Sequence, residues 1–594
     1  MFRPVLDAVG GSLFLTAIVA MLPLLTIFIL LGWLRLAAWK AGIAALVVSL
    51  IVAIWAYSMP VGMAVSSGIE GMAFGFFPIM WIVINAIWVY NMTVETGHFD
   101  VLRRSFASVS DDQRIQAVII AFSFGALLEA LAGFGTPVAI TSVMLIALGF
   151  RPLKAAVVAL VANTAPVAFG ALAVPITTLA TVSQVPEHTL SQIVGRQTPI
   201  LGLFVPMALV FIIDRGRGVR ATLPATLTCG IAFALAQFVT SNFISTQLTD
   251  IVASLVSALA VVLLLRVWQP KEHYVEADED EAVAVSTRGS ATRAMAAEGR
   301  DRGDRTATAE TTRTDGTAGT TARGGDGDGS GSSDLEEMVR HDREAHDSGA
   351  DIFKAYAPYL IIIIVFVLAQ LPGIKDALDA PTKVFTWFGM DGLQTASGKA
   401  STIPQFKLNW LAAAGTLMLI AGLVTIPVIG ATPAQALRAF GRTFRQLAAA
   451  IVTVMAVLGL AYVMNASGQT TTLGTWMAGA GGAFAILSPI LGWIGVAVTG
   501  SDTSSNSLFG ALQVTAAKDA GLHQALMAAA NSSGGVLGKM ISPQNLAIAA
   551  AAVGLSGREG DIFRKAIGWS LLFLAFMCVL VFLQSTAVLS WMIP

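Results

Sequence analysis

The sequence predicts an all-α polytopic membrane protein with about twelve transmembrane helices and two re-entrant helical hairpins. Three observations lead to this class. Of the 594 residues, 55% are apolar and only 12% are charged, against about 25% charged in an ordinary soluble domain. Apolar runs of roughly 20 residues, the length that crosses a bilayer, recur along the chain. Two further apolar runs have glycine-rich centres, and their arms are too short to cross.

Twelve apolar runs are predicted to span the membrane. The first run extends to about Leu34, which is too long for a cleaved signal segment. Basic loops favour the cytoplasm, and this rule leaves both termini outside. The predicted spans are 12–34, 41–59, 71–93, 153–180, 198–213, 222–242, 250–268, 352–370, 408–427, 446–466, 522–550 and 566–592.

The run 117–150 is predicted to be a re-entrant hairpin. Arginines and a lysine flank both of its ends, so both ends are expected on the cytoplasmic side. Its centre, Gly133–Pro137, breaks the helix and leaves arms of about 15 residues, roughly 23 Å at 1.5 Å per residue. That is shorter than the ~30 Å hydrocarbon core. The run 485–519, with its centre at Gly500–Asn506, is the matching hairpin and is expected to enter from the other side.

An internal repeat follows the two hairpins. Residues 163–175 and 531–543 share the pattern N-[ST]-x5-G-x4-P. Because the charge rule gives the two units opposite orientations, the pattern indicates an inverted-topology repeat, which is typical of secondary transporters. Broken helices are expected within spans 153–180 and 522–550, at Asn163–Gly170 and Asn531–Gly538.

The repeat divides the chain into two membrane halves, 1–270 and 351–594. The intervening residues 271–350 contain 10 Lys and Arg against 19 Asp and Glu, a balance of −9. They are rich in Thr, Gly and Ala and nearly free of aromatic residues. Such a segment cannot bury enough apolar area to offset its ordering entropy. A disordered acidic cytoplasmic insert is therefore predicted.

The hairpin tips and helix breaks form the candidate substrate site. New helix N-termini carry partial positive charge and attract anions, and nearby hydroxyls can bond a substrate hydroxyl. A small carboxylate is the expected ligand. The candidate substrate-binding residues are Gly135, Thr136, Asn163, Thr164, Ser501, Thr503, Ser504, Asn531, Ser532 and Lys539.

Three charged residues lie in predicted membrane segments, where charge is costly and points to function. Lys539 can pair with a substrate carboxylate, or form a structural ion pair with Asp502 or Glu129. Glu129 and Asp502 are the candidates for carrying a coupling proton, because carboxylates removed from water can bind protons near physiological pH. For Glu129, helix capping or pairing within its hairpin is the alternative. Arg196 can attract anions or anchor a helix end.

Other protein classes lack their signatures in this sequence. There is no HExxH, GxSxG or Walker A motif, so an enzyme and an ATP-driven pump are not expected. The two cysteines, Cys229 and Cys578, lie apart in apolar runs, so neither a disulfide nor a metal site is predicted. No cofactor is expected. The scattered basic charges do not form a nucleic-acid surface.

At its motifs the chain resembles the lactate permease family. The resemblance extends through both membrane halves, whereas the insert has no recognised counterpart. The segments that carry it are FGALLEALAGFGTPVAI (124–140), NTAPVAFGA (163–171), GRQTP (195–199), TGSDTSSNSLFGALQ (499–513) and GKMISPQNLAIA (538–549).

This resemblance implies uptake of L-lactate, and often D-lactate and glycolate, with protons across the plasma membrane. The family is similar to a wider ion-transporter superfamily, which implies an elevator-type mechanism and, by analogy, a homodimer. Because sites in that superfamily often bind Na⁺, a sodium-coupled symporter, or an exchanger of another small organic anion, is the alternative.

Overall fold

The computed structural model describes residues 1–107, 109–133, 135–274, 276 and 347–594. Met1–His273 and Asp347–Pro594 together form one compact unit, and Tyr274–His346 is a second. Most of the predicted insert 271–350 lies outside the described residues.

The N-terminal half of this unit is entirely helical. In the labels used here, η marks a π or 3₁₀ turn. The elements are α1 (Leu13–Phe28), η1 (Ile29–Trp33), α2 (Ala38–Trp55), α3 (Val61–Phe74), η2 (Gly75–Met80), α4 (Trp81–Glu95), α5 (His98–Ala107), α6 (Gln113–Ala117), η3 (Val118–Phe124), α7 (Gly125–Leu131), α8 (Thr136–Ala147), α9 (Pro152–Ala162), η4 (Val167–Phe169), α10 (Gly170–Ser183), α11 (Glu187–Val239), η5 (Thr240–Ile244) and α12 (Thr249–Leu265).

The C-terminal half adds further helices and two short strands. These are α15 (Gly349–Leu368), α16 (Ile374–Asp379), β1 (Lys383–Thr386), β2 (Gln405–Leu408), α17 (Ala414–Val428), α18 (Pro433–Ser467), α19 (Gln469–Met477), η6 (Ala478–Ala483), α20 (Phe484–Thr499), α21 (Asp502–Asp519), α22 (Gln524–Gly538), η7 (Lys539–Ile541), α23 (Pro543–Ala552), α24 (Glu559–Gln584) and η8 (Ser590–Met592).

The two strands modify the all-α prediction. β1 pairs antiparallel with β2, with Lys383 opposite Leu408, in the segment between α16 and α17. Phe385 and Trp387 both pack against Phe406. Aromatic side chains on a half-buried surface favour strands, so these ring contacts stabilise the pairing of β1 with β2.

Nine helices in the described residues are long and apolar enough to cross a membrane, or ten if α9 and α10 are counted as one bent span. This bears out an all-α multi-pass membrane protein. The predicted spans 198–213 and 222–242 are the two arms of α11, which breaks at Asp214–Arg215. The predicted span 408–427 is shorter in the structure, because β2 ends at its start and α17 begins only at Ala414.

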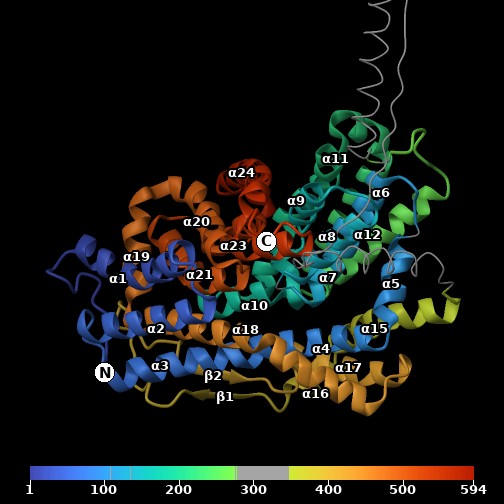
Figure 1. The fold of residues 1–594 in the computed structure, drawn as a ribbon. Coiled ribbons are helices and arrows are strands. Elements are labelled where there is room, and N and C mark those ends of the chain that lie inside the picture. Colours follow the sequence, from blue (N-terminus) through green and yellow to red (C-terminus); the bar gives the residue numbers. More distant parts are fainter. Residues whose placement is uncertain (108, 134, 275, 277–346) are drawn as a thin grey trace, which may run out of the picture. The chain divides into compact units, whose positions relative to one another are not determined.

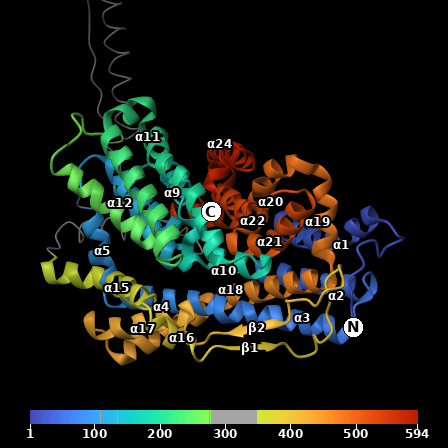
Figure 2. The same cartoon turned by 180° about the vertical axis from the view of Figure 1, so that it is seen from behind.

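The helices fall into two groups that both views show (Figures 1 and 2). In one group, α18 packs along α2, α3 and α4, while α17 packs on α4 and α15 on α17. In the other, α20, α21 and α22 pack on one another and contact α10, α11 and α24. The groups meet where α10 contacts α4 and where α21 contacts α18.

Glycines allow α20 and α22 to touch backbone to backbone. A methyl group at Gly492 would overlap the carbonyl oxygen of Asn531, and one at Gly534 would overlap that of Pro489. Small residues are what membrane helices use for such close approach. This contact fixes α20 of the second hairpin against α22, which ends directly before Lys539.

The close contact predicts the effect of Gly534→Ala. The added methyl group must push the helices apart, so the free energy of unfolding should fall by about 1–3 kcal/mol. Thermal unfolding of the purified protein in detergent measures this change. Gly441→Ala is the control, because Gly441 lies in α18 with open space around its Cα. Equal melting of the Gly534→Ala variant and the wild type would contradict the contact.

One end of the insert is tied to the described body. The Arg104 guanidinium donates to both carboxylate oxygens of Asp347, at 2.9 and 2.6 Å. This interaction lowers the pKa of Asp347 below its usual value. The ion pair therefore persists at neutral pH and weakens only in acid.

Candidate functional site

A small cavity lies where the two hairpin tips meet the two interrupted helices. Its free volume is about 40 Å³. Three of its lining side chains are ionisable, and all three were predicted as site residues. The lining residues are Glu129, Gly133, Val167, Gly170, Ala171, Val174, Pro175, Gly500, Ser501, Asp502, Thr503 and Lys539.

The first hairpin runs from α6 through α7 to a turn before α8. Its two ends lie together, because Gln113 Nε2 donates to the carbonyl of Leu148 at 2.6 Å. The turn requires glycine at Gly133 and Gly135, whose φ values are 51° and 83°. Within the predicted hairpin 117–150, Glu129 sits in α7, just before the turn.

The second hairpin turns at Gly500, where φ is 76°. Ser501 then caps α21 by accepting from the Ser504 backbone N–H at 3.2 Å. Asp502 therefore occupies the first turn of a helix, where the partial positive charge of the N-terminus favours a carboxylate. The polar turn within the predicted hairpin 485–519 lines the cavity.

Lys539 and Glu129 form an ion pair inside the cavity. Lys539 Nζ lies 2.5 Å from Glu129 Oε1, and the side chains are only 8% and 4% exposed. This is one of the alternatives that the sequence left open for Lys539. Glu129 Oε2 is buried with no hydrogen-bond partner. Removing one partner of a buried ion pair strongly destabilises a protein, because the other charge is left uncompensated. Each of these two charges therefore stabilises the burial of the other.

Glu129 needs glycine on the facing helix. A methyl group at Gly170 would lie 2.8 Å from Glu129 Oε1 and 3.1 Å from Glu129 Cγ. Gly170 thus makes room for the carboxylate beside the first interrupted helix. Gly170 is the glycine of the NTAPVAFGA motif (163–171).

Asp502 is held by a different set of partners. Its Oδ2 accepts from Ser532 Oγ at 2.5 Å and from Asn506 Nδ2 at 3.3 Å, while Oδ1 is buried without a partner. Asn506 also donates to the carbonyl of Pro175 at 3.1 Å. Asp502 therefore joins the second hairpin to α22, and Asn506 joins it to α10.

The interrupted helices differ in where they break. The helical stretches Pro152–Ala162 and Val167–Ser183 are bent by 65° across residues 163–166, inside the predicted break Asn163–Gly170. In the second unit the prediction was wrong, because Asn531–Gly538 lies within the continuous helix α22. The interruption comes later, at Lys539–Ser542, where Pro543 starts α23. Pro543 has no N–H to continue the helix, and this sets the break.

Of the other predicted residues, Ser501 and Thr503 line the cavity, whereas the rest lie around it. Asn531 bonds to Asn506 and Gln513, and Ser532 to Asp502. Gly135 packs by Asn545 and Ile548 on α23. Thr164 and Ser504 are buried and Thr136 half-buried. Both amide atoms of Asn163 are buried without a partner, so Asn163 has unused hydrogen-bonding capacity next to the first break.

Two asparagines that the site prediction omitted, Asn506 and Asn545, stabilise the backbone around the cavity. Asn506 donates to Asp502 and to the carbonyl of Pro175. Asn545 donates to the carbonyl of Lys539 at 3.1 Å and to Ser542 Oγ at 3.0 Å. The signal for Asn545 was present in the sequence, since Ser-Pro-x-Asn is a helix start in which serine caps the asparagine N–H. Asn545 stabilises the backbone turn that presents Lys539.

Arg196 anchors a helix rather than lining the cavity. Its guanidinium donates to Asn242 Oδ1 and to the carbonyl of Met592, both at 2.9 Å. Beside it, Gln197 accepts from Ser533 Oγ at 2.5 Å and donates to Gln584 at 2.7 Å. The GRQTP segment therefore ties α11 to α22 and to the C-terminal segment.

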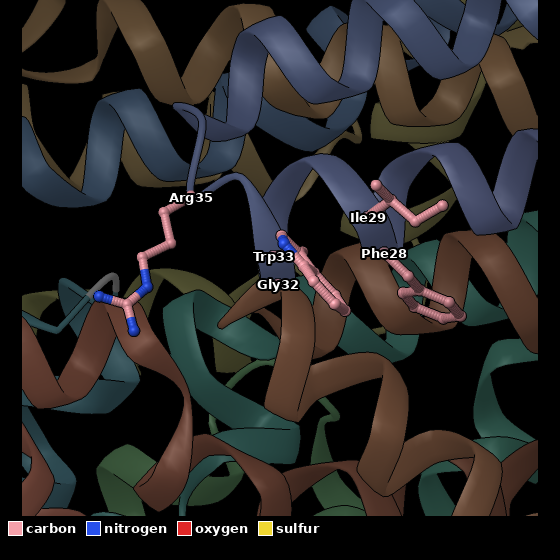
Figure 3. A pocket seen from close by; sticks show the side chains of 5 residues that line it. All are labelled: Phe28, Ile29, Gly32, Trp33 and Arg35. Carbon is pink, nitrogen blue, oxygen red and sulfur yellow. The ribbon is translucent and has the colours of Figure 1, made fainter.

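A second hollow, of about 500 Å³, lies at η1. It is lined by Phe28, Ile29, Gly32, Trp33 and Arg35, and Figure 3 shows the two aromatic rings and Arg35 around it. Aromatic and basic side chains at the end of an apolar helix are typical of the membrane–water boundary. This hollow lacks the buried polar groups that recognise a small anion.

Apolar helices surrounding a buried, charged cavity define a multi-pass membrane protein with a polar site inside. The family model described as L-lactate permease matches residues 16–298 and 331–588. The chain belongs to the L-lactate permease family, and it is a membrane transporter of the plasma membrane, not an enzyme.

Three relatives illustrate the similarity. The L-lactate permease of Bacillus subtilis (strain 168) is 39% identical over 99% of this chain and 98% of its own length. The L-lactate permease of Escherichia coli (strain K12) is 38% identical over 98% of both chains. The glycolate permease GlcA of Escherichia coli (strain K12) is 38% identical over 97% of this chain and 96% of its own length.

Proposed function

We propose that this protein takes up L-lactate, and related 2-hydroxymonocarboxylates such as D-lactate and glycolate, together with protons. The observation that carries the proposal is the buried ion pair between Lys539 and Glu129 in the cavity. The names of the relatives supply the substrate class. The pair supplies a reason for coupling to protons.

The coupling follows from competition for one cation. A substrate carboxylate that binds Lys539 must displace Glu129 from it. A displaced, buried and ionised Glu129 would be an uncompensated charge, which is costly in a low-dielectric site. Glu129 avoids that cost by taking a proton. One proton therefore accompanies each substrate anion.

Neighbouring groups give the substrate its other contacts. The hydroxyls of Ser501 and Thr503 line the cavity, and the N-terminus of α21 favours negative charge there. The free volume of about 40 Å³ is close to one water's share of the liquid, about 30 Å³. The hairpin tips must therefore separate before a hydroxy acid can bind.

The transport cycle in this proposal is of the elevator type. The group of helices with both hairpins moves against the group built on α18, carrying the loaded cavity from one side to the other. The proposal includes twelve spans and two re-entrant hairpins in an inverted repeat. The similar shapes of the hairpins, each turning at a positive-φ glycine, support it.

Sodium coupling is the second candidate, because one observation favours it. Asp502 Oδ1 has no partner and lies at the same tip as Ser501 and Thr503. A carboxylate with hydroxyl oxygens is a ligand set that a hard cation accepts. In that case Na⁺, and not a proton on Glu129, would balance the substrate charge.

Uptake of labelled L-lactate into proteoliposomes distinguishes the two. For one-to-one symport, an acid-outside gradient of one pH unit should concentrate lactate about tenfold without Na⁺, since one unit is about 1.4 kcal/mol. Accumulation that needs a Na⁺ gradient instead would move the coupling ion to the Asp502 tip. No accumulation with either gradient would make lactate the wrong substrate.

A further inference from the structure

A second buried carboxylate, Asp250, lies near the cavity without lining it. Asp250 is fully buried in the first turn of α12. Its Oδ1 accepts from Gln237 Nε2 at 2.8 Å, and its Oδ2 has no hydrogen-bond partner among the described residues. No ion pair involves Asp250 within the described residues. Charge on such a group would be poorly compensated.

The packing of α12 brings Asp250 to the level of Glu129. Ser257 Oγ on α12 lies 2.9 Å from Ser123 Oγ on the first hairpin arm. Asp250 is two helical turns before Ser257 and so shares its face of α12. Glu129 is six residues beyond Ser123 on the antiparallel arm, so both carboxylates lie about 10 Å along the axes from the serine contact. α12 also packs directly on α7, the helix that carries Glu129.

A separate group of polar residues, one of them near Asp250 in the sequence, lies at the end of the helices that lacks the basic loops. Gln247, three residues before Asp250, donates to Glu187 at 2.7 Å, and Glu187 also accepts from Thr177 at 3.3 Å. Glu187 is partly exposed. The opposite end of these helices carries Lys154, which donates to the carbonyl of Ile213. By the charge rule, Glu187 is on the outer side.

Few other charges face Asp250. α7 contributes Glu129, and α11 contributes Glu187 together with Arg196, which is held by Asn242 and Met592. The elements η3, η5 and α10, which also contact α12, contain no ionisable side chain. Among the described residues no cation compensates Asp250, because Arg196 is held by Asn242 and Met592 and Lys539 is held by Glu129.

From this geometry we infer that Asp250 relays protons between the outer side and Glu129. The inference rests on the proposed proton-coupled function. When lactate displaces Glu129 from Lys539, Asp250 gives its proton to Glu129. Asp250 then takes a new proton from the end of the helices that carries Glu187. Asp250 does not line the cavity, so we expect no direct contact between Asp250 and a bound lactate.

Asp250→Asn tests the relay, because Asn keeps an oxygen for Gln237 and cannot release a proton. Net uptake driven by a pH gradient should slow by about 100-fold, the scale of a lost proton-transfer group. Exchange of internal for external lactate should be unchanged, because the loaded carrier then moves without releasing its proton. Asp250→Glu should restore net uptake. Asp519→Asn, at the exposed end of α21, is the matched control.

The outcomes separate this inference from the proposed function. If wild-type protein does not accumulate lactate on a pH gradient, the proposed function fails whatever Asp250 does. If wild type accumulates lactate and Asp250→Asn does so at the same rate, the relay is overturned. Equal losses of exchange and net uptake would also overturn it and make Asp250 structural. Asp250→Ser, whose hydroxyl can accept from Gln237, provides the same readout if the Asn variant is not folded.

Discussion

Lys539→Gln should weaken lactate binding by roughly 100-fold or more, because a buried charge partner is usually worth 2–5 kcal/mol. Lys539 is the cation that lines the cavity, and its side chain is buried there. Titration of the purified transporter with lactate, followed by intrinsic tryptophan fluorescence or calorimetry, measures the affinity. Transport at saturating lactate should fall with it.

The variant also leaves Glu129 buried without its partner, so a folding control is needed. Glu129→Gln/Lys539→Gln replaces the ion pair with two neutral side chains of similar size, and should remain folded while still failing to bind lactate. Lys518→Gln, on the exposed end of α21, should behave as wild type. Lactate affinity near that of wild type in the double variant would show that Lys539 is only structural.

Glu129→Gln should separate transport from proton coupling. The amide resembles a permanently protonated carboxyl, so lactate can take Lys539 without any proton being bound. Lactate exchange should persist, while accumulation driven by a pH gradient should be lost. Lactate affinity in this variant should not change with pH, whereas wild-type affinity should fall about tenfold per unit once Glu129 is ionised. Counterflow and pH-jump uptake in proteoliposomes measure both properties.

The control for this variant is Glu95→Gln, at the end of α4, where Glu95 pairs with Arg438 away from the cavity. It should accumulate lactate as wild type does. If Glu129→Gln still accumulates lactate on a pH gradient, Glu129 does not carry the coupling proton. Asp502 would then be the remaining carboxylate on the cavity wall.

The sequence predicted those features of the fold that depend on composition and local patterning. Apolar run length identified most spans, and Gly133, Gly135 and Gly500 marked the hairpin turns through the backbone freedom that only glycine has. The cost of charge in a membrane identified Glu129, Asp502 and Lys539, and all three line one cavity.

Features that depend on three-dimensional packing were missed. The repeat matched Asn531–Gly538 to Asn163–Gly170, but only the first unit breaks there; in α22, Gly534 and Gly538 serve close packing on α20. The choice between Asp502 and Glu129 as the partner of Lys539 needed the distance between residues 410 apart in the chain. Asp250 lies in an ordinary span, and only the packing of α12 on the first hairpin relates it to the cavity.

The most direct test of the account is the number of protons taken up when lactate binds. Purified transporter in weakly buffered detergent, mixed with lactate at a pH where Glu129 is ionised, should take up about one proton per lactate bound, because each lactate displaces one carboxylate that must be neutralised. The same measurement on Glu129→Gln should give none. Lactate binding to wild type without proton uptake, or uptake unchanged in Glu129→Gln, would contradict the competition for Lys539 on which the proposed mechanism depends.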